Sequence, residues 1–213
     1  MKLRRAAVAA GLAVAAVAAH AQFVAVNEGF ENVAALPGWV INNASTPLGS
    51  TNWFQGSAAI FPAFAGGPNS YIAANFNSAA AGGTIANFLF TPVFTTEGGS
   101  TVSFWARSIG EDGFVDHLRV GRTTGGTTAG DFIQIGSDIT LSSTWTQFTF
   151  AIAKQPVGAT GRAVIEYFGV ADTSDFVGVD SLTVNVVPEP ETWALFGLGL
   201  AALGVVKRRR QSA

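Results

Sequence analysis

Acidic side chains are the groups in this 213-residue sequence best suited to do chemistry, and five of the twelve within residues 22–187 lie in two short segments. The first segment holds Glu111, Asp112 and Asp116, and the second holds Asp172 and Asp175. Neighbouring carboxylates can bind a hard cation such as calcium or serve as the two acids of a glycosidase. The first segment lacks the Asp-x-Asp-x-Asp-Gly spacing of a helix–loop–helix calcium site. Each segment is therefore either a solvated turn or a cation site.

The sequence gives little support for a Ser-His-Asp relay or for the carboxyl pair of a glycosidase. His117 is the single histidine within residues 22–187, and Asp116 adjoins it. Neighbouring side chains on a strand point to opposite faces, whereas a Ser-His-Asp relay needs an aspartate that is hydrogen-bonded to the imidazole nitrogen. No Gly-x-Ser-x-Gly segment occurs in the sequence, and Glu111 and Asp116 share one loop rather than flanking a cleft. We predict that the protein is not an enzyme.

Charge and composition narrow the classes of partner. The whole chain has a formal net charge of −2, but residues 22–187 hold five basic and twelve acidic residues, a net charge of −7. This excess argues against a nucleic-acid partner and suits a hard cation. Cysteine is absent, which excludes disulfides and thiolate metal sites. Hydrophobic residues make up 48% and charged residues 12%, which excludes an intrinsically disordered chain.

The elements that must position these side chains are predicted to be strands. Residues 22–187 show short β-branched and aromatic runs separated by Gly, Pro, Asn and Ser, without a helical period. We predict an all-β, two-sheet, jelly-roll-like sandwich. The candidate strands are 23–26, 38–42, 52–55, 58–61, 71–76, 87–94, 101–107, 115–122, 132–135, 146–152, 163–170 and 177–186.

The last candidate strand changes its alternation. Val177 and Val179 occupy odd positions, whereas Leu182 and Val184 occupy even positions. Because side chains alternate with a period of two, the shift would bury the wrong face unless a β-bulge intervenes near Asp180. Asp180 is then a carboxylate presented from an apolar strand, and it requires a partner if it is buried.

The N-terminal segment, residues 1–21, reads as a secretory signal. Basic residues within 2–5 precede an apolar run over 6–19, and Ala19 and Ala21 are small residues at the positions that signal peptidase inspects. We predict a signal helix and cleavage after Ala21. The alternative is a retained membrane anchor.

The C-terminal segment, residues 188–213, also combines an apolar run with basic residues. An apolar run over 193–206 would rise about 21 Å as a helix, short of the roughly 30 Å of a hydrocarbon core. Flanking residues can extend it to a marginal transmembrane helix, with Trp193 at the interface. The basic residues that follow predict a cytoplasmic C-terminus. They are Lys207, Arg208, Arg209 and Arg210.

This C-terminal segment resembles the PEP-CTERM sorting signal of Gram-negative bacteria. The resemblance rests on the Val-Pro-Glu-Pro motif at residues 187–190, on a short apolar helix with Trp193, and on the basic residues that follow this helix. The resemblance implies processing by an exosortase and display at the cell surface, commonly in bacteria that make exopolysaccharide. Glu191 departs from the small residue usual at its position, and an ordinary C-terminal anchor is the alternative. The motif is Val187, Pro188, Glu189 and Pro190.

The body resembles the choice-of-anchor J domains, which are related to cleaved-adhesin and MAM-like jelly rolls. The resemblance implies that Trp39 and Trp105 lie inside and leaves Trp53 and Trp145 as candidates for stacking on sugars. The matching segments, in chain order, are Glu28-Gly29-Phe30-Glu31, Leu36-Pro37-Gly38-Trp39, Asn52-Trp53, Phe90-Thr91-Pro92-Val93-Phe94, Val102-Ser103-Phe104-Trp105-Ala106, Trp145, Ala163-Val164-Ile165-Glu166-Tyr167 and Phe176-Val177-Gly178-Val179-Asp180-Ser181-Leu182-Thr183-Val184.

The same resemblance implies a calcium ion that ties the first strand to the last. Its side-chain ligands here would be Glu31 and Asp180, with carbonyls and water supplying the remaining oxygens. Ser181 replaces a frequent second aspartate of the family, which removes one charge. The alternative is that Glu31 and Asp180 bond to backbone groups or to a base.

Together these features predict a secreted, exosortase-sorted surface or extracellular-matrix protein with an adhesive or structural sandwich, passing transiently through the inner membrane. The alternative is a carbohydrate-binding module associated with exopolysaccharide in a biofilm.

Overall fold

A computed structural model of the chain describes residues 23–187; the predicted signal segment, the apolar run over 193–206 and the residues from Pro188 onward lie outside these described residues. The described chain is all-β, with short 3-10 turns η1 (Val33–Ala35), η2 (Phe76–Ser78), η3 (Ala129–Asp131) and η4 (Ala171–Thr173). The strands are β1 (Phe23–Glu28), β2 (Val40–Asn43), β3 (Thr46–Leu48), β4 (Phe54–Gln55), β5 (Ile72–Asn75), β6 (Ala79–Phe90), β7 (Phe94–Thr95), β8 (Ser100–Ser108), β9 (His117–Thr123), β10 (Ile133–Gln134), β11 (Ile139–Thr140), β12 (Thr146–Ile152), β13 (Thr160–Val170) and β14 (Phe176–Val186).

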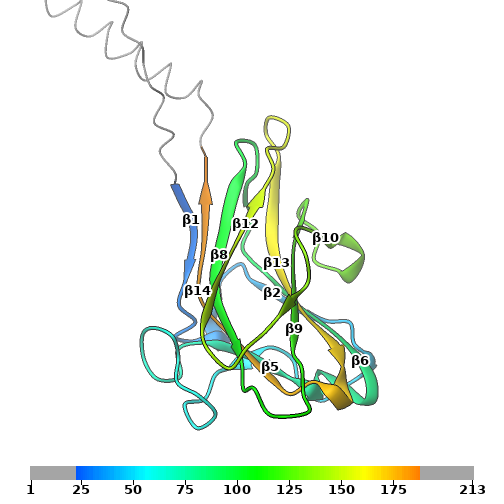
Figure 1. Ribbon diagram of the computed structural model, residues 1–213. Coiled ribbons are helices and arrows are strands. Elements are labelled where there is room, and N and C mark those ends of the chain that lie inside the picture. The colour runs from blue at the N-terminus through cyan, green and yellow to red at the C-terminus, as the bar shows by residue number, and fades with distance from the viewer. Residues whose placement is uncertain (1–22, 188–213) are drawn as a thin grey trace, which may run out of the picture. The chain divides into compact units, whose positions relative to one another are not determined.

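The strands form two antiparallel sheets (Figure 1). The six-stranded sheet has the order β12–β8–β14–β5–β4, and β1 also pairs with β14. The eight-stranded sheet has the order β10–β9–β13–β6–β2, and β11, β3 and β7 add to β9, β6 and β13. The predicted two-sheet sandwich is confirmed. No helix within residues 23–187 has the length and apolar character needed to cross a membrane.

Alternation of side chains along the strands builds the core between the sheets. On β8, Val102, Phe104 and Ala106 are buried and face inward, while the residues between them are partly exposed. On β13 of the facing sheet, Ala163 and Ile165 are buried in the same cluster. A period of two thus places one face of each strand in the shared core, which burial of apolar area stabilises.

The last strand contains the predicted bulge. The register between β14 and β8 shifts between Asp180 and Thr183, and Ser181 adopts φ = 50°. A non-glycine residue rarely enters this left-handed region, because its Cβ crowds the backbone there. The bulge turns Leu182 into the core and leaves Asp180 on the other face of the sheet, fully buried.

We expect Ser181→Val to lower the free energy of unfolding by about 1–3 kcal/mol, because a β-branched residue is strained at positive φ. Urea unfolding followed by tryptophan fluorescence measures the change. Asn185→Val, at a partly exposed strand position without positive φ, is the matched control and is expected to be nearly neutral. Equal losses in the two variants would contradict the strained bulge.

Candidate functional site: an acidic pocket with two exposed phenylalanines

A pocket lies where three strand connections meet: the β5–β6 turn, the β8–β9 loop and the β13–β14 turn. Two of these connections are the acidic segments singled out in the sequence, some sixty residues apart. The amide of Val115 donates to the carbonyl of Thr173 (2.9 Å), and the amide of Asp175 donates to Oδ1 of Asp116 (2.9 Å). The fold therefore joins two separate acidic turns into one site.

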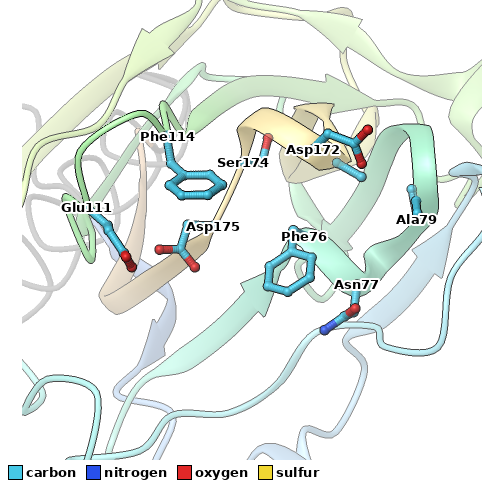
Figure 2. A pocket seen from close by; sticks show the side chains of 10 residues that line it. Phe76, Asn77, Ala79, Glu111, Phe114, Asp172, Ser174 and Asp175 are labelled. Carbon is cyan, nitrogen blue, oxygen red and sulfur yellow. The ribbon is translucent and has the colours of Figure 1, made fainter.

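The pocket has a volume of about 480 Å³ and combines aromatic rings with carboxylates. Phe76 and Phe114 keep 42% and 40% of their surface exposed, and Figure 2 shows their rings on two sides of Asp175. Glu111 and Asp172 also line it. A concave site with apolar walls and a few polar groups is the usual form of a small-molecule site, and this volume lies within the typical range.

A buried carboxylate supports the pocket from behind. Asp116 is 3% exposed and accepts hydrogen bonds from the Tyr167 hydroxyl (2.7 Å) and the Asp175 amide (2.9 Å). Burial, together with the negative charge of Asp116, raises the pKa of Tyr167, which therefore stays a neutral donor. These two bonds fix the β8–β9 loop against the segment that leads into β14.

The carboxyl of Asp175, like the hydroxyl of Ser174, has a buried oxygen without a hydrogen bond among the described residues of this site. Its Oδ2 is buried and receives no hydrogen bond from the described residues. Burial raises the pKa of Asp175, and the nearby negative charges of Asp116 and Glu111 raise it further. Asp172, by contrast, accepts a hydrogen bond from the amide of Gly82 (2.8 Å).

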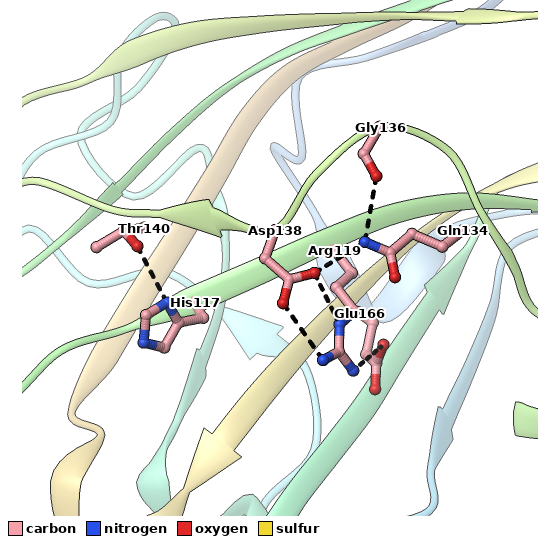
Figure 3. Close-up of polar contacts among 7 residues, drawn as sticks. All are labelled: His117, Arg119, Gln134, Gly136, Asp138, Thr140 and Glu166. Carbon is pink, nitrogen blue, oxygen red and sulfur yellow. Dashed lines mark hydrogen bonds and ion pairs between the residues drawn. The ribbon is translucent and has the colours of Figure 1, made fainter.

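A second polar cluster lies on the outer face of the eight-stranded sheet (Figure 3). Arg119 bonds Asp138 (Nε–Oδ1, 3.0 Å), lies 3.7 Å from Glu166, and stacks 3.7 Å over the ring of Phe168. Burial raises the pKa of Glu166, and Arg119 opposes the rise. Arg119 gives both acidic side chains of this cluster a partner, so we interpret it as a structural link between β9, β13 and the segment that follows β10.

The predicted calcium ligands occupy different environments. Asp180 is fully buried; its Oδ2 accepts from the amides of Phe64 (2.8 Å) and Ala65 (3.0 Å), and its Oδ1 accepts from the Ser181 hydroxyl (3.2 Å). Burial raises the pKa of Asp180, and the two amides oppose the rise. Glu31 is exposed. Within residues 23–187, no group of three or more His, Cys, Asp or Glu side chains could hold a metal ion. The carboxylate of Asp180 is therefore bonded to amide and hydroxyl donors, and the calcium role of Glu31 and Asp180 stays a prediction.

The tryptophans do not form the expected sugar platform. Trp53 is 4% exposed in the core, where its Nε1 donates to the carbonyl of Asn87 (3.2 Å), so its assignment as a stacking candidate is wrong. Trp105, expected inside, lies on the outer face of β8 and stacks on Phe64 with ring centroids 3.8 Å apart. Trp145 is partly buried and bonds the carbonyl of Pro62 (3.1 Å). The sequence shows tryptophans but does not show which loop covers each one.

Two known sequence families match parts of this chain. Residues 23–166 match the Cleaved Adhesin Domain. The chain belongs to the cleaved adhesin family. Residues 186–210 match the PEP-CTERM protein-sorting motif, so the predicted combination of an adhesin-like body and a sorting signal is confirmed.

Solved structures share the fold of this cleaved adhesin domain. The K1 domain of Lys-gingipain from Porphyromonas gingivalis has a TM-score of 0.59 at 20% identity, covering 76% of this chain and 98% of that domain. The K3 domain of the same protein has a TM-score of 0.57 at 20% identity, covering 78% and 99%. The CBM22-1 xylan-binding domain from Paenibacillus barcinonensis Xyn10C has a TM-score of 0.50 at 12% identity, covering 81% and 99%. No curated protein matches the sequence.

We expect Asp180→Ala to lower the free energy of unfolding of this cleaved adhesin domain by about 1–3 kcal/mol, because the amides of Phe64 and Ala65 lose their acceptor. Thermal unfolding with calcium and with a chelator should show the same loss in both conditions. If the chelator lowers the melting temperature of the native chain but not of the variant, Asp180 binds calcium and its role as an anchor for the loop is contradicted.

We expect Asp175→Asn to raise stability at neutral pH. Because the pKa of Asp175 is raised in the folded state, native stability falls as pH rises through that pKa, and the asparagine removes this loss. Below the ordinary aspartate pKa the two proteins should be equally stable. Urea unfolding across the acid-to-neutral range measures the difference.

Asp138→Asn is the matched control for this titration. The Arg119 hydrogen bond lowers the pKa of Asp138, so this carboxylate stabilises the fold at neutral pH and the stabilisation is lost as pH falls. The two variants should therefore shift neutral-pH stability in opposite directions. The same direction in both would contradict the account of Asp175.

Proposed function

We propose that this cleaved adhesin domain is exported, processed by an exosortase and displayed at the bacterial surface or in the extracellular matrix as a non-catalytic binding module. The observation that carries the proposal is the sorting motif over 186–210, which begins at Val186, where β14 ends. Signal peptidase would cleave after Ala21, and the apolar run over 193–206 would anchor the chain transiently in the inner membrane. The net charge of −7 over residues 22–187 favours partners other than nucleic acid.

The geometry of the acidic side chains supports binding rather than catalysis. Glu111 and Asp175 lie close enough to interact directly, whereas glycosidases hold their two carboxyls about 5 Å or more apart. His117 lies beside Thr140 on an outer face, whereas Asp116 is bonded to the buried Tyr167. Glu111 and Asp175 therefore lack the separation of a glycosidase pair, and His117 and Asp116 do not form a relay.

Polysaccharide binding is the second candidate function, and the pocket favours it. Exposed rings of Phe76 and Phe114 offer faces for sugar rings, and carboxylates accept hydrogen bonds from hydroxyls. The xylan-binding domain named above shares the two-sheet fold. A glycan array and a pulldown with exopolysaccharide test this candidate, and absence of binding in both would exclude it.

We expect the double variant Pro188→Ala, Pro190→Ala to be exported but to keep its tail and remain in the membrane fraction of cells that contain an exosortase. The reason is that the two prolines define the motif from which processing is inferred. Fractionation and immunoblotting of a tagged body measure the outcome. Pro156→Ala, in an exposed turn of the body, is the matched control and should be processed as the native chain is. Native protein found in the cytosol, or native tail left uncleaved in such cells, would contradict the proposal.

A further inference from the structure

The pocket carries negative charge that no lining residue neutralises. Glu111, Asp172 and Asp175 line it, and the buried carboxylate of Asp116 lies behind Asp175. None of the described residues that line it is basic. The acidic side chains on the outer face of the eight-stranded sheet, by contrast, share Arg119. A ligand of this pocket must therefore bring positive charge if it is to bind without electrostatic cost.

The unsatisfied oxygen of Asp175 points to a hydrogen-bond donor. Oδ2 of Asp175 is buried without a donor, and the carboxyl that faces it, Glu111, is also an acceptor when ionised (Figure 2). Two carboxylates in this arrangement need a proton or a donating cation between them. An ammonium group carries three donors and one positive charge, so it can satisfy both oxygens at once.

The walls of the pocket indicate what carries the ammonium. The exposed rings of Phe76 and Phe114 attract a cation and pack against the C–H face of a ring. The volume of about 480 Å³ is far larger than an ammonium group needs. Polar groups of Asn77 and Asp172 also line the pocket, away from the acidic pair. These features call for a bulky ligand with several polar groups.

We propose that the pocket binds an amino sugar of a polysaccharide, with the ammonium on Glu111 and Asp175 and the sugar ring against Phe76 and Phe114. The proposal rests on the proposed binding function and names its ligand class. A lysine side chain brings the same cation but only one polar group. A uronic acid would meet like charge. A metal ion would gain no ligands from the phenylalanines, and no group of three metal-binding side chains occurs within residues 23–187.

Isothermal titration of the purified full chain with three probes tests the proposal. The first probe is a glucosamine trimer. The second is the N-acetylglucosamine trimer, which has the same rings without the charge. The third is Nα-acetyl-lysine amide, which keeps the side-chain ammonium but has no sugar rings. We expect the glucosamine trimer to bind at least tenfold more tightly than either of the others. Binding should weaken as pH falls and the carboxylate of Asp175 takes up a proton.

Three variants locate the binding. Asp175→Asn and Phe114→Ala are each expected to weaken binding of the glucosamine trimer at least tenfold. Asp138→Asn, which removes a carboxylate on the outer face of the eight-stranded sheet, away from the pocket lining, should leave binding unchanged. Because Asp175→Asn is also expected to stabilise the fold, loss of binding with a raised melting temperature separates recognition from misfolding.

Several results would overturn the proposal. Equal binding of the acetylated trimer would remove the role of the ammonium, and equal binding of the lysine probe would assign the pocket to a peptide. Binding that survives in both Asp175→Asn and Phe114→Ala would place it elsewhere. If none of the probes binds while a glycan array or an exopolysaccharide pulldown is positive, the amino-sugar inference fails and the proposed binding function stands.

Discussion

The carboxylate of Asp116 is the interaction on which the candidate site depends. It accepts from the hydroxyl of Tyr167 on β13 and from the amide of Asp175 just before β14, so one buried side chain ties three segments together. A buried charge is costly without hydrogen-bond donors, and Oδ1 of Asp116 receives two. The negative charge held there also acts on Asp175, which faces the pocket. The side chain that holds the walls of the pocket together thus also adds to its negative charge.

The two outer faces of the sandwich are largely closed by the protein itself. Over the six-stranded sheet, the loop over 57–70 buries Phe61 and bonds its backbone to Asp180. On the eight-stranded sheet, Arg119 pairs with its acidic neighbours and covers Phe168. Polar groups there are mostly satisfied, whereas the pocket keeps an unsatisfied carboxylate and exposed rings. The pocket thus differs from the two outer faces of the sandwich, and this difference, more than any sequence motif, identifies it as the candidate binding site.

Local patterning predicted most of the strands and the bulge, and it failed where pairing is decided at long range. Alternation predicted β12 with its observed bounds and predicted the bulge after Asp180. The run over 58–61 is a turn rather than a strand, because Phe61 enters an aromatic cluster from a loop. The first half of β6 was missed because its small residues and glycines carry no β signal; pairing with β3 holds it in the sheet, and β13 pairs with β6 only from Thr84 onward.

The site was predicted only in fragments. Both acidic turns stand out in the sequence, but their meeting depends on the pairing of β8 with β14, which no local pattern encodes. The role of Phe76 could not be inferred either, since an isolated phenylalanine most often lies in a core. Asp180 could be singled out from the broken alternation, yet its partners are amides of a distant loop.

Backbone amide chemical-shift mapping of the isotopically labelled chain, titrated with the glucosamine trimer, tests the central claim most directly. The account predicts that the largest changes fall on the three connections of the pocket, within residues 76–81, 109–116 and 171–175. Changes gathered instead around Arg119 and Asp138, or around Phe64 and Trp105, would contradict it.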